Sequence, residues 1–442
     1  MNYIAQVLFL ALLASVAFFI YKRVAIIKST IQLGKSLDRK DNPSQRLQTM
    51  LLVAFGQGKM FQRPLVGLMH FIIYAGFIIV NVELLEIILD GILGTHRLFA
   101  PVIGETLYHF LINTFEFLAV AVIVVCVAFL SRRNILKIKR FWQKEMKQWP
   151  RTDANLILIF EIVLMTLFLT MNATDAILQE RGVAHYEKIG RFFFSQFLIP
   201  AFEGLDNGVL VGVERTAWWL HIAGIMGFAW YVTYSKHLHI ILAFPNTYFS
   251  NLKSKGEMPN MPTVTNEVKI ALGLINANDV PASQVARFGA KDVNDLTWKQ
   301  LLEAYSCTEC GRCTSQCPAN QTGKELSPRK IMMDTRDRLE EIGKQIASGK
   351  TAEEALNDGK SLYGDYISKE EIMACTTCNA CVEACPVNIE PLSIILDIRR
   401  FIAMEEAATP ASWNAMFGNL ENNMAPWKFS PADRFNWVNK MQ

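Results

Sequence analysis

Five long apolar stretches constrain this chain more than any other feature of its sequence. A helix needs about 20 predominantly apolar residues to cross the hydrocarbon core of a bilayer. The stretches lie at about 4–21, 64–89, 106–130, 155–178 and 213–240. All five fall before about residue 245, although the whole chain is 51% hydrophobic and 19% charged. The sequence therefore predicts a membrane half followed by a soluble half.

The first apolar stretch resembles a signal peptide only in its position. Lys22 and Arg23 follow the apolar run instead of preceding it, and no small-residue cleavage site is evident. We interpret 4–21 as an uncleaved anchor, with a signal peptide as the alternative.

Basic residues in the connecting loops predict the orientation in the membrane. Loop 22–63 holds nine Lys or Arg and loop 131–154 holds eight, whereas loop 90–105 holds one and loop 179–212 holds three. The two basic loops are expected in the cytoplasm of a bacterial inner membrane. This places the N-terminus outside and everything after residue 240 inside. The formal net charge of +3 gives no support for nucleic-acid binding.

Eight of the nine cysteines form two short runs after residue 300, and Cys126 stands alone in an apolar stretch as an expected buried hydrophobe. Each run has the spacing C-x2-C-x2-C-x3-C-P, which is typical of two-cluster ferredoxins. In that pattern the fourth cysteine of each run ligates the other cluster. The predicted ligand sets are Cys307, Cys310, Cys313 and Cys385 for one [4Fe–4S] cluster, and Cys375, Cys378, Cys381 and Cys317 for the second. Structural zinc and disulfides are the alternatives, and the doubled four-cysteine run fits both poorly.

The spacer between the two cysteine runs separates this chain from a minimal ferredoxin. It contains the 57 residues between Cys317 and Cys375, and much of it has a helical pattern. In this respect residues 295–400 resemble the ferredoxin-type subunit of heterodisulfide reductase. That resemblance implies a helical dicluster ferredoxin.

Four histidines lie in or at the ends of the apolar stretches, where ionisable groups usually mark a ligand or a pathway. His70 and His239 are expected near the cytoplasmic side, and His109 and His221 near the outer side. Two imidazoles at one depth can supply both axial ligands of haem b. One or two haems are therefore predicted; a hydrogen bond between helices is the alternative role for each histidine.

A second resemblance concerns residues 1–245. The stretch from His221 to His239 resembles the fifth helix of the respiratory nitrate reductase gamma subunit, where both histidines are haem ligands, and the sequence around His70 resembles its second helix. Where that family has a further histidine on helix two, this chain has Val80, so His109 is the substitute expected here.

Three further histidines and two glutamates in the membrane half have less specific expected roles. His237 is expected at the surface or against a haem propionate, and His96 and His185 in outer loops. Glu116 and Glu161 lie within apolar stretches, where they would relay protons or form hydrogen bonds within the bundle. The aromatic segment 190–200 is expected in the membrane interface.

Together these patterns predict an all-α protein of four parts. Residues 1–243 form a five-helix haem-b and quinone domain, 244–297 a linker, 298–400 a helical ferredoxin domain with two [4Fe–4S] clusters, and 401–442 a tail.

The expected function is electron transfer between the (mena)quinone pool and a cytoplasmic partner, as a subunit of a quinone-linked oxidoreductase. The expected partner is a CCG-domain protein like that of heterodisulfide reductase, a dehydrogenase or an electron-transfer flavoprotein, because no flavin or nucleotide motif is found. A membrane-anchored iron–sulfur sensor or anchor without haem is the alternative. An ion-translocating unit would need more membrane carboxylates along one path.

Overall fold

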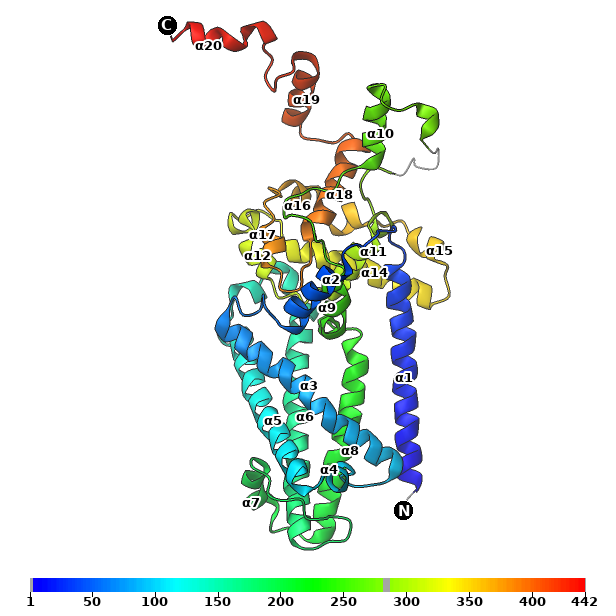
Figure 1. Cartoon of the computed structure of the whole chain (residues 1–442), viewed down its shortest axis with the longest axis vertical. Helices are drawn as coiled ribbons and strands as arrows, with labels where there is room; N and C mark the ends of the chain where they lie inside the picture. Colours follow the sequence, from blue (N-terminus) through cyan, green and yellow to red (C-terminus); the bar gives the residue numbers. More distant parts are fainter. Residues whose placement is uncertain (1–2, 281–286, 442) are drawn as a thin grey trace.

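A computed structural model describes residues 3–280 and 287–441. Within these ranges the chain is helical, and its only β-type pairings are two isolated bridges. The molecule is elongated: a bundle of long helices carries a compact domain of shorter helices at one end, and the C-terminal segment extends beyond that domain (Figure 1). The all-α prediction is confirmed.

Four helices of the described ranges are long and apolar enough to cross a membrane. They are α1 (Tyr3–Ile31), α3 (Pro64–Leu93), α5 (Glu105–Asn134) and α6 (Trp149–Glu180). Proline in the first turn favours the starts of α3 and α6, because its missing N–H is not needed there. Gly94 ends α3 in a left-handed conformation that glycine adopts without strain.

The fifth predicted span corresponds to α8 (Asn207–Val232), which packs against α6 but is not among the four. The five-helix count therefore stays a prediction. A helix was expected up to residue 240, but α8 ends eight residues earlier. The carboxylate of Asp153 accepts hydrogen bonds from Ser235 Oγ at 2.7 Å and from the Lys236 backbone N–H at 3.2 Å. This buried carboxylate stabilises the turn into the 3₁₀ helix η5 (Lys236–Leu238) and α9 (His239–Tyr248).

The loops between the spans contain short helices. On the side of the compact domain they are α2 (Pro43–Met50), η1 (Leu51–Phe55), η2 (Lys139–Phe141) and η3 (Lys144–Met146). At the other end lie α4 (Phe99–Ile103), η4 (Ser195–Leu198) and α7 (Ile199–Phe202). In the aromatic segment 190–200, Phe193 and Phe197 are exposed while Phe192 is buried.

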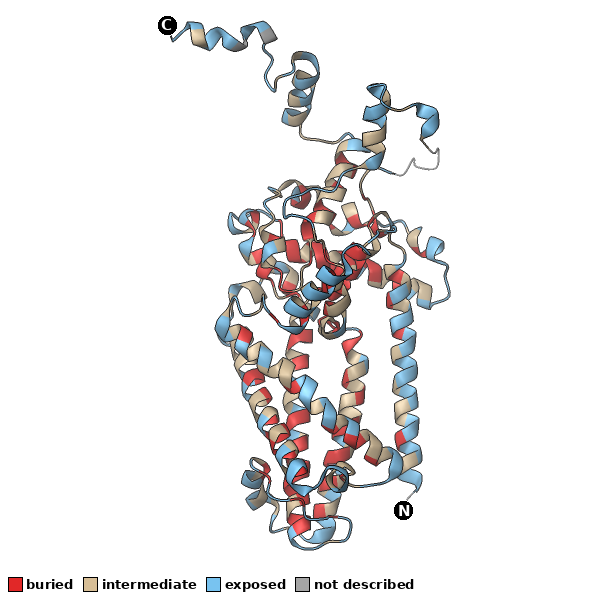
Figure 2. Ribbon diagram, viewed as in Figure 1, coloured by how far each residue is buried: buried red, intermediate tan, exposed pale blue. Residues whose placement is uncertain are grey.

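The compact domain is built around α14 (Pro328–Ala347), which packs against α11 (Trp298–Ser306) and α18 (Pro391–Met404). Shorter elements complete it: α12 (Arg312–Gln316), α13 (Pro318–Gln321), α15 (Ala352–Leu356), η9 (Leu362–Tyr366), α16 (Lys369–Met373) and α17 (Ala380–Ala384). Buried residues are dense here and along the inner faces of the bundle, whereas α1 is largely exposed (Figure 2).

The two basic loops and the compact domain meet at the same end of the bundle. Arg23 pairs with Glu340 at 2.5 Å, and Arg329 of α14 pairs with Glu145 at 2.6 Å. Farther along, Arg312 donates to the Lys59 carbonyl oxygen at 3.0 Å. One apolar core continues across this junction, from Ile27 and Phe228 into the compact domain. The two halves are therefore packed together.

The predicted linker and tail contain further short helices. α10 (Pro262–Ala271) and the 3₁₀ turns η6 (Ala277–Asp279) and η8 (Val293–Asp295) fall in 244–297. In the tail, α19 (Ala411–Asn423), η10 (Pro431–Phe435) and α20 (Asn436–Asn439) extend from the compact domain (Figure 1).

Candidate functional site

The eight clustered cysteines line two small cavities in the compact domain. One cavity is lined by Cys307, Cys310, Cys313 and Cys385, and the other by Cys317, Cys375, Cys378 and Cys381. These are the two sets of four that the spacing predicts, including the exchange of the fourth cysteine. We call the cavity that contains Cys307 the inner cysteine cavity and the cavity that contains Cys317 the outer cysteine cavity.

The two cysteine loops share one backbone design. Glu309 and Thr377, each two residues after the first cysteine, have positive φ angles of 53° and 57°. Gly311 and Asn379, each four residues after it, have φ angles of 69° and 60° and precede α12 and α17. A positive φ is costly for glutamate and for β-branched threonine. The two loops therefore have the same wrapped backbone conformation.

Four of the eight thiols, including Cys307 and Cys385, are buried. Among the described residues, no group of three His, Cys, Asp or Glu side chains is arranged to hold a single metal ion. Burial raises the pKa of Cys307 to about 11 and that of Cys385 to about 12. Loading of iron must therefore displace the thiol protons.

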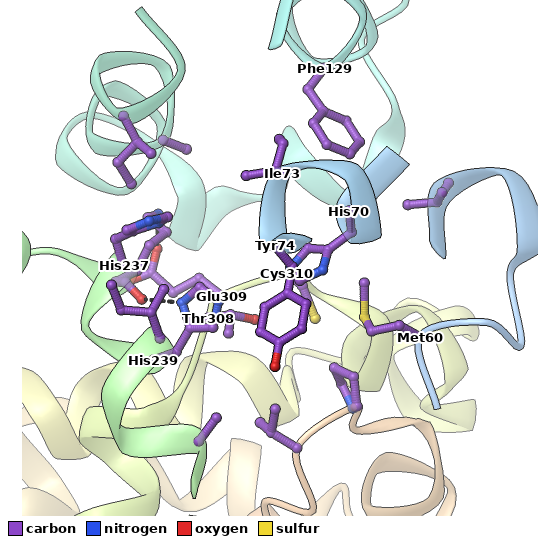
Figure 3. A pocket seen from close by; sticks show the side chains of 18 of the residues that line it. Met60, His70, Ile73, Tyr74, Phe129, His237, His239, Thr308, Glu309 and Cys310 are labelled. Carbon is purple, nitrogen blue, oxygen red and sulfur yellow. Dashed lines mark hydrogen bonds and ion pairs between the residues drawn. The ribbon is translucent and has the colours of Figure 1, made fainter. Parts of the chain in front are cut away.

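A third and larger cavity, of about 360 Å³, lies where the bundle meets the compact domain. We call it the junction cavity. Its lining includes His70 of α3, His239 of α9 and Cys310 of the inner cysteine cavity (Figure 3). Apolar side chains such as Ile73 and Phe129 complete its walls. One cavity thus brings together a predicted haem-ligand pair and a predicted cluster ligand.

His70 and His239 are arranged as a pair. Their ring centres lie 6.5 Å apart with an angle of 43° between the ring planes. Two imidazoles that bind one metal from opposite sides have ring centres roughly 6 Å apart, because each metal–nitrogen bond is about 2 Å long. His239 Nδ1 lies 3.0 Å from the Lys236 carbonyl oxygen, which leaves Nε2 free and is the usual outer contact of a ligating histidine.

Several polar atoms facing this region are buried without a hydrogen-bond partner. They include His70 Nδ1, the Tyr74 hydroxyl and Gln57 Oε1, together with nitrogens of Arg133 and Arg140. All five residues line the junction cavity. Buried polar groups in native proteins are almost always hydrogen-bonded, so this set indicates a bound group with polar and anionic atoms.

An ion-pair link joins the membrane half to the inner cysteine loop. Lys236, whose carbonyl holds His239, pairs through its ammonium with Glu309, which lies between Cys307 and Cys310. Glu309 also pairs with Arg336 of α14. Burial favours a higher pKa for Glu309, but Arg336 and Lys236 outweigh it and lower that pKa. The carboxylate is therefore charged and fixes the loop against the turn that carries His239.

His109 and His221, the second predicted pair, have separate hydrogen-bond partners, and their role as haem ligands stays a prediction. His109 Nε2 lies 2.7 Å from the Arg191 carbonyl oxygen, and its ring contacts Phe193. His221 Nδ1 lies 2.9 Å from the Leu164 carbonyl oxygen, and its ring contacts Phe168. No ring contact joins the two histidines in the described ranges. Each has a local partner that explains its position.

Glu116, one of the two predicted relay groups, holds the aromatic segment. Its carboxylate accepts from the backbone N–H groups of Phe194 at 2.7 Å and Ser195 at 3.2 Å, which is the hydrogen-bonding alternative. Glu161 instead lines the junction cavity.

The sequence reasoning missed a buried polar network at the far end of the bundle. Arg97 donates to Asp175 at 2.6 Å and to Asn172 at 2.8 Å. Asp90 accepts from the Arg97 backbone N–H at 2.8 Å, and Glu86 accepts from the Phe99 backbone N–H at 2.8 Å. The only local signal was the spacing of Glu83, Glu86 and Asp90, which places three acids on one face of α3.

Comparison with known proteins supports this interpretation of the compact domain. Residues 306–389 match the family of 4Fe-4S dicluster domains. An alignment of 453 residues shows 29% identity to the "Probable iron-sulfur-binding oxidoreductase FadF" of Bacillus subtilis (strain 168), covering 95% of this chain and 59% of the relative. The "EtfAB:quinone oxidoreductase" of Syntrophomonas wolfei is 25% identical over 430 residues, covering 91% of this chain and 55% of the relative. The chain thus spans little more than half the length of these two relatives.

A third relative matches a smaller part. The "Probable membrane-anchored ferredoxin" of Chromohalobacter salexigens is 35% identical over 168 residues, which are 35% of this chain and 24% of the relative. The expected resemblance to heterodisulfide reductases is confirmed, because two kinds of subunit of such enzymes from Methanosarcina also match. No solved structure matches the chain significantly.

These findings indicate an iron–sulfur, membrane-anchored electron-transfer subunit of oxidoreductase type. They support [4Fe–4S] clusters in the dicluster domain. The resemblance of residues 1–245 to nitrate reductase gamma subunits stays a prediction.

Proposed function

We propose that this chain is the cytochrome b and iron–sulfur subunit of a quinone-linked oxidoreductase. The observation that carries the proposal is the junction cavity, which is lined at once by His70, His239 and Cys310. The two imidazole rings are spaced as in a pair that binds one metal ion. The cavity that they line also reaches a thiol of the inner cysteine cavity.

The residues of the junction cavity fit haem b. His70 and His239 would supply the two axial nitrogens, and the apolar walls would cover the macrocycle. The unpartnered atoms of Tyr74, Arg133 and Arg140 match a group with polar substituents. Haem b would supply a one-electron carrier at this point. Because the Nε2 atom of His109 is already engaged by the Arg191 carbonyl oxygen, the proposal is limited to one haem.

The protein fixes the order of the sites along the molecule. The inner cysteine cavity, assigned to the first [4Fe–4S] cluster, adjoins the junction cavity through Cys310. The outer cysteine cavity, assigned to the second cluster, reaches the surface at Cys378, which is exposed. The inner site therefore faces the membrane half, and the outer site is open to a partner protein.

The chain then connects two reactions that each involve two electrons. On the membrane side, reduction of a quinone to a quinol takes up two electrons and two protons, and quinol oxidation releases them. On the other side, a cytoplasmic partner donates or accepts the same two electrons. The name of the Syntrophomonas relative, with a quinone and EtfAB, supports an electron-transfer flavoprotein as this partner. A CCG-domain protein or another dehydrogenase is the further possibility that the sequence raised.

The loop charges support a bacterial inner-membrane location with the N-terminus outside. The basic loops 22–63 and 131–154 lie at the end of the bundle that carries the compact domain, as this orientation requires. The iron–sulfur domain would then lie in the cytoplasm.

The test is a reduced-minus-oxidised optical spectrum with haem and iron quantification on the purified full chain. We expect one haem b in the wild type and none in His70→Ala or His239→Ala, with the non-haem iron of the clusters unchanged in all three. The matched controls are His109→Ala and the exposed loop variant His185→Ala, both of which should retain haem. Absence of haem from the wild type would overturn the cytochrome proposal and leave an iron–sulfur anchor or sensor.

A further inference from the structure

The junction cavity has a cationic wall whose two arginines, Arg133 and Arg140, carry buried nitrogens without an acceptor. Arg133 lies in the last turn of α5 and Arg140 in η2. Arg133 Nε and Nη2 and Arg140 Nε are buried and have no hydrogen-bond acceptor. Both guanidinium groups lie over the ring of Phe141, at 4.5 Å and 4.8 Å from its centre. The two side chains are therefore close together and held by one aromatic residue.

Another arginine of the same protein, Arg338, shows the carboxylate partners that Arg133 and Arg140 lack among the described residues. Arg338 is completely buried and donates to the carboxylates of Asp292 and Asp358 at 2.7–3.3 Å. No ion pair with a carboxylate is found for Arg133 or Arg140 within the described ranges. Burial lowers the pKa of Arg140 to about 10, so its guanidinium still carries a full charge at neutral pH.

The carboxylates nearest this wall are already engaged. Asp153 accepts from Tyr231, Ser235 and Lys236, and Glu145 accepts from Ser327 and Arg329. Glu309 is held by Lys236 and Arg336. Glu161 and Cys310 also line the cavity, but neither accepts a hydrogen bond from these buried nitrogens, so a bound anion would satisfy them. An arginine fork fits a carboxylate or a phosphate oxygen.

We propose that Arg133 and Arg140 bind the two propionate carboxylates of a haem held by His70 and His239. This inference rests on the proposed function, because the four residues line one cavity. Two cations on one wall match two carboxylates on one edge of the macrocycle, and the apolar remainder of the cavity matches its other edges. The arginines thus set the rotation of the haem about the axis through the histidines.

Charge also gives these residues a redox role. A guanidinium beside the haem disfavours the oxidised form, which carries one more positive charge than the reduced form. Removal of either arginine should therefore lower the midpoint potential of the haem. It should also make that potential more dependent on pH, because a propionate without its cation titrates nearer to neutral pH.

The experiment compares Arg133→Gln, Arg140→Gln and the double variant with the wild-type full chain in optical redox titrations at several pH values. Arg151→Gln is the matched control, because it removes one positive charge at the same end of the bundle from a side chain that packs on Trp142 and does not line the cavity. Non-haem iron content serves as the check on folding.

We expect at least a tenfold fall in the ratio of reduced to oxidised haem at fixed potential in the double variant, equivalent to about 59 mV for one electron. We also expect wild-type apoprotein to bind haem at least tenfold more tightly than haem dimethyl ester, and the double variant to lose this preference. Arg151→Gln should behave like the wild type in both measurements.

Two results would overturn the inference while leaving the proposed function intact. One is a double variant that has full haem content, the same haem midpoint potential as the wild type, and the same tighter binding of haem than of haem dimethyl ester. The other is an anionic phospholipid that co-purifies with the wild type and not with the double variant while the haem titration is unchanged, which would assign the arginines to a lipid phosphate. A wild type without haem would instead overturn the proposed function itself.

Discussion

The link from Lys236 through Glu309 to Arg336 predicts a large effect from a small substitution. Glu309→Gln removes one negative charge that two cations share, and it hardly changes the volume of the side chain. The side chains of Glu309 and Lys236 are 2% and 9% exposed, so neither hydration nor salt compensates for the loss. Breaking a buried ion pair by removing one partner costs about 3–5 kcal/mol. Arg336, at 16% exposure, recovers some hydration, which favours the lower end of that range.

A loss of about 3 kcal/mol should lower the melting midpoint of the compact domain by roughly 10 °C. The assay follows the visible absorbance of the iron–sulfur clusters in the full chain during heating at one fixed scan rate. The matched control is Glu325→Gln, which removes an equal charge from an exposed pair with Lys144 at 3.6 Å. Such a surface pair contributes only about 0–1 kcal/mol.

A double-mutant cycle separates the ion pair from other effects of the substitution. The double variant Lys236→Met with Glu309→Gln should lose less stability than the sum of the single variants, because both single changes remove the same Lys236–Glu309 ion pair, which can be lost only once. If Glu309→Gln melts at the same temperature as Glu325→Gln, or if the two single losses simply add, the link does not stabilise the junction and the reasoning is refuted.

Two further predictions concern the compact domain. Cys385→Ser should abolish the cluster of the inner cavity and Cys317→Ser that of the outer cavity, each halving the non-haem iron content. Analysis of non-haem iron combined with electron paramagnetic resonance distinguishes this from ligation within each run, in which the two losses would be interchanged. Burial favours a higher pKa for Asp358, but hydrogen bonds from Arg338 outweigh it and lower that pKa to about 2. Because the pKa is lowered on folding, the stabilisation is complete above the ordinary value of 3.8 and is lost as the pH falls through about 2. In urea unfolding, the stability gap between the wild type and Arg338→Met should be constant above about pH 4 and narrow below it; a gap that widens on acidification would contradict this.

The features that follow from local spacing were accessible from the sequence alone. The doubled cysteine pattern predicted which four thiols share each cavity, since the wrapped loop and the exchanged fourth cysteine are properties of the motif. Apolar runs predicted the start of α3 at residue 64 and of α5 within one residue. The pairing of His70 with His239 followed from depth in the membrane, because the length of a helix fixes the depth of each residue.

Features that depend on contacts between distant residues were not accessible. A continuous helix up to residue 240 would direct His237 away from His239, but Asp153 stabilises a turn there, and the two rings lie 5.5 Å apart. The Lys236–Glu309 pair joins residues 73 positions apart and leaves no local pattern. Hydrogen bonding of His109 to the 190–200 segment depends on how an outer loop folds back, which neither composition nor periodicity specifies.

The exposure of Cys378 has a consequence for how this protein would fail. Dioxygen and chelators attack a cluster most readily where its ligands meet solvent. Cys378 of the outer cysteine cavity is the most exposed of the eight thiols, whereas Cys310 and Cys313 of the inner cavity are only partly exposed. Under oxidative stress the site that faces the partner should be damaged first, while the inner site stays intact beneath it. Exposure to air would then stop electron transfer to the partner protein before it damages the redox sites of the membrane half. Repair would need to rebuild only the outer cluster.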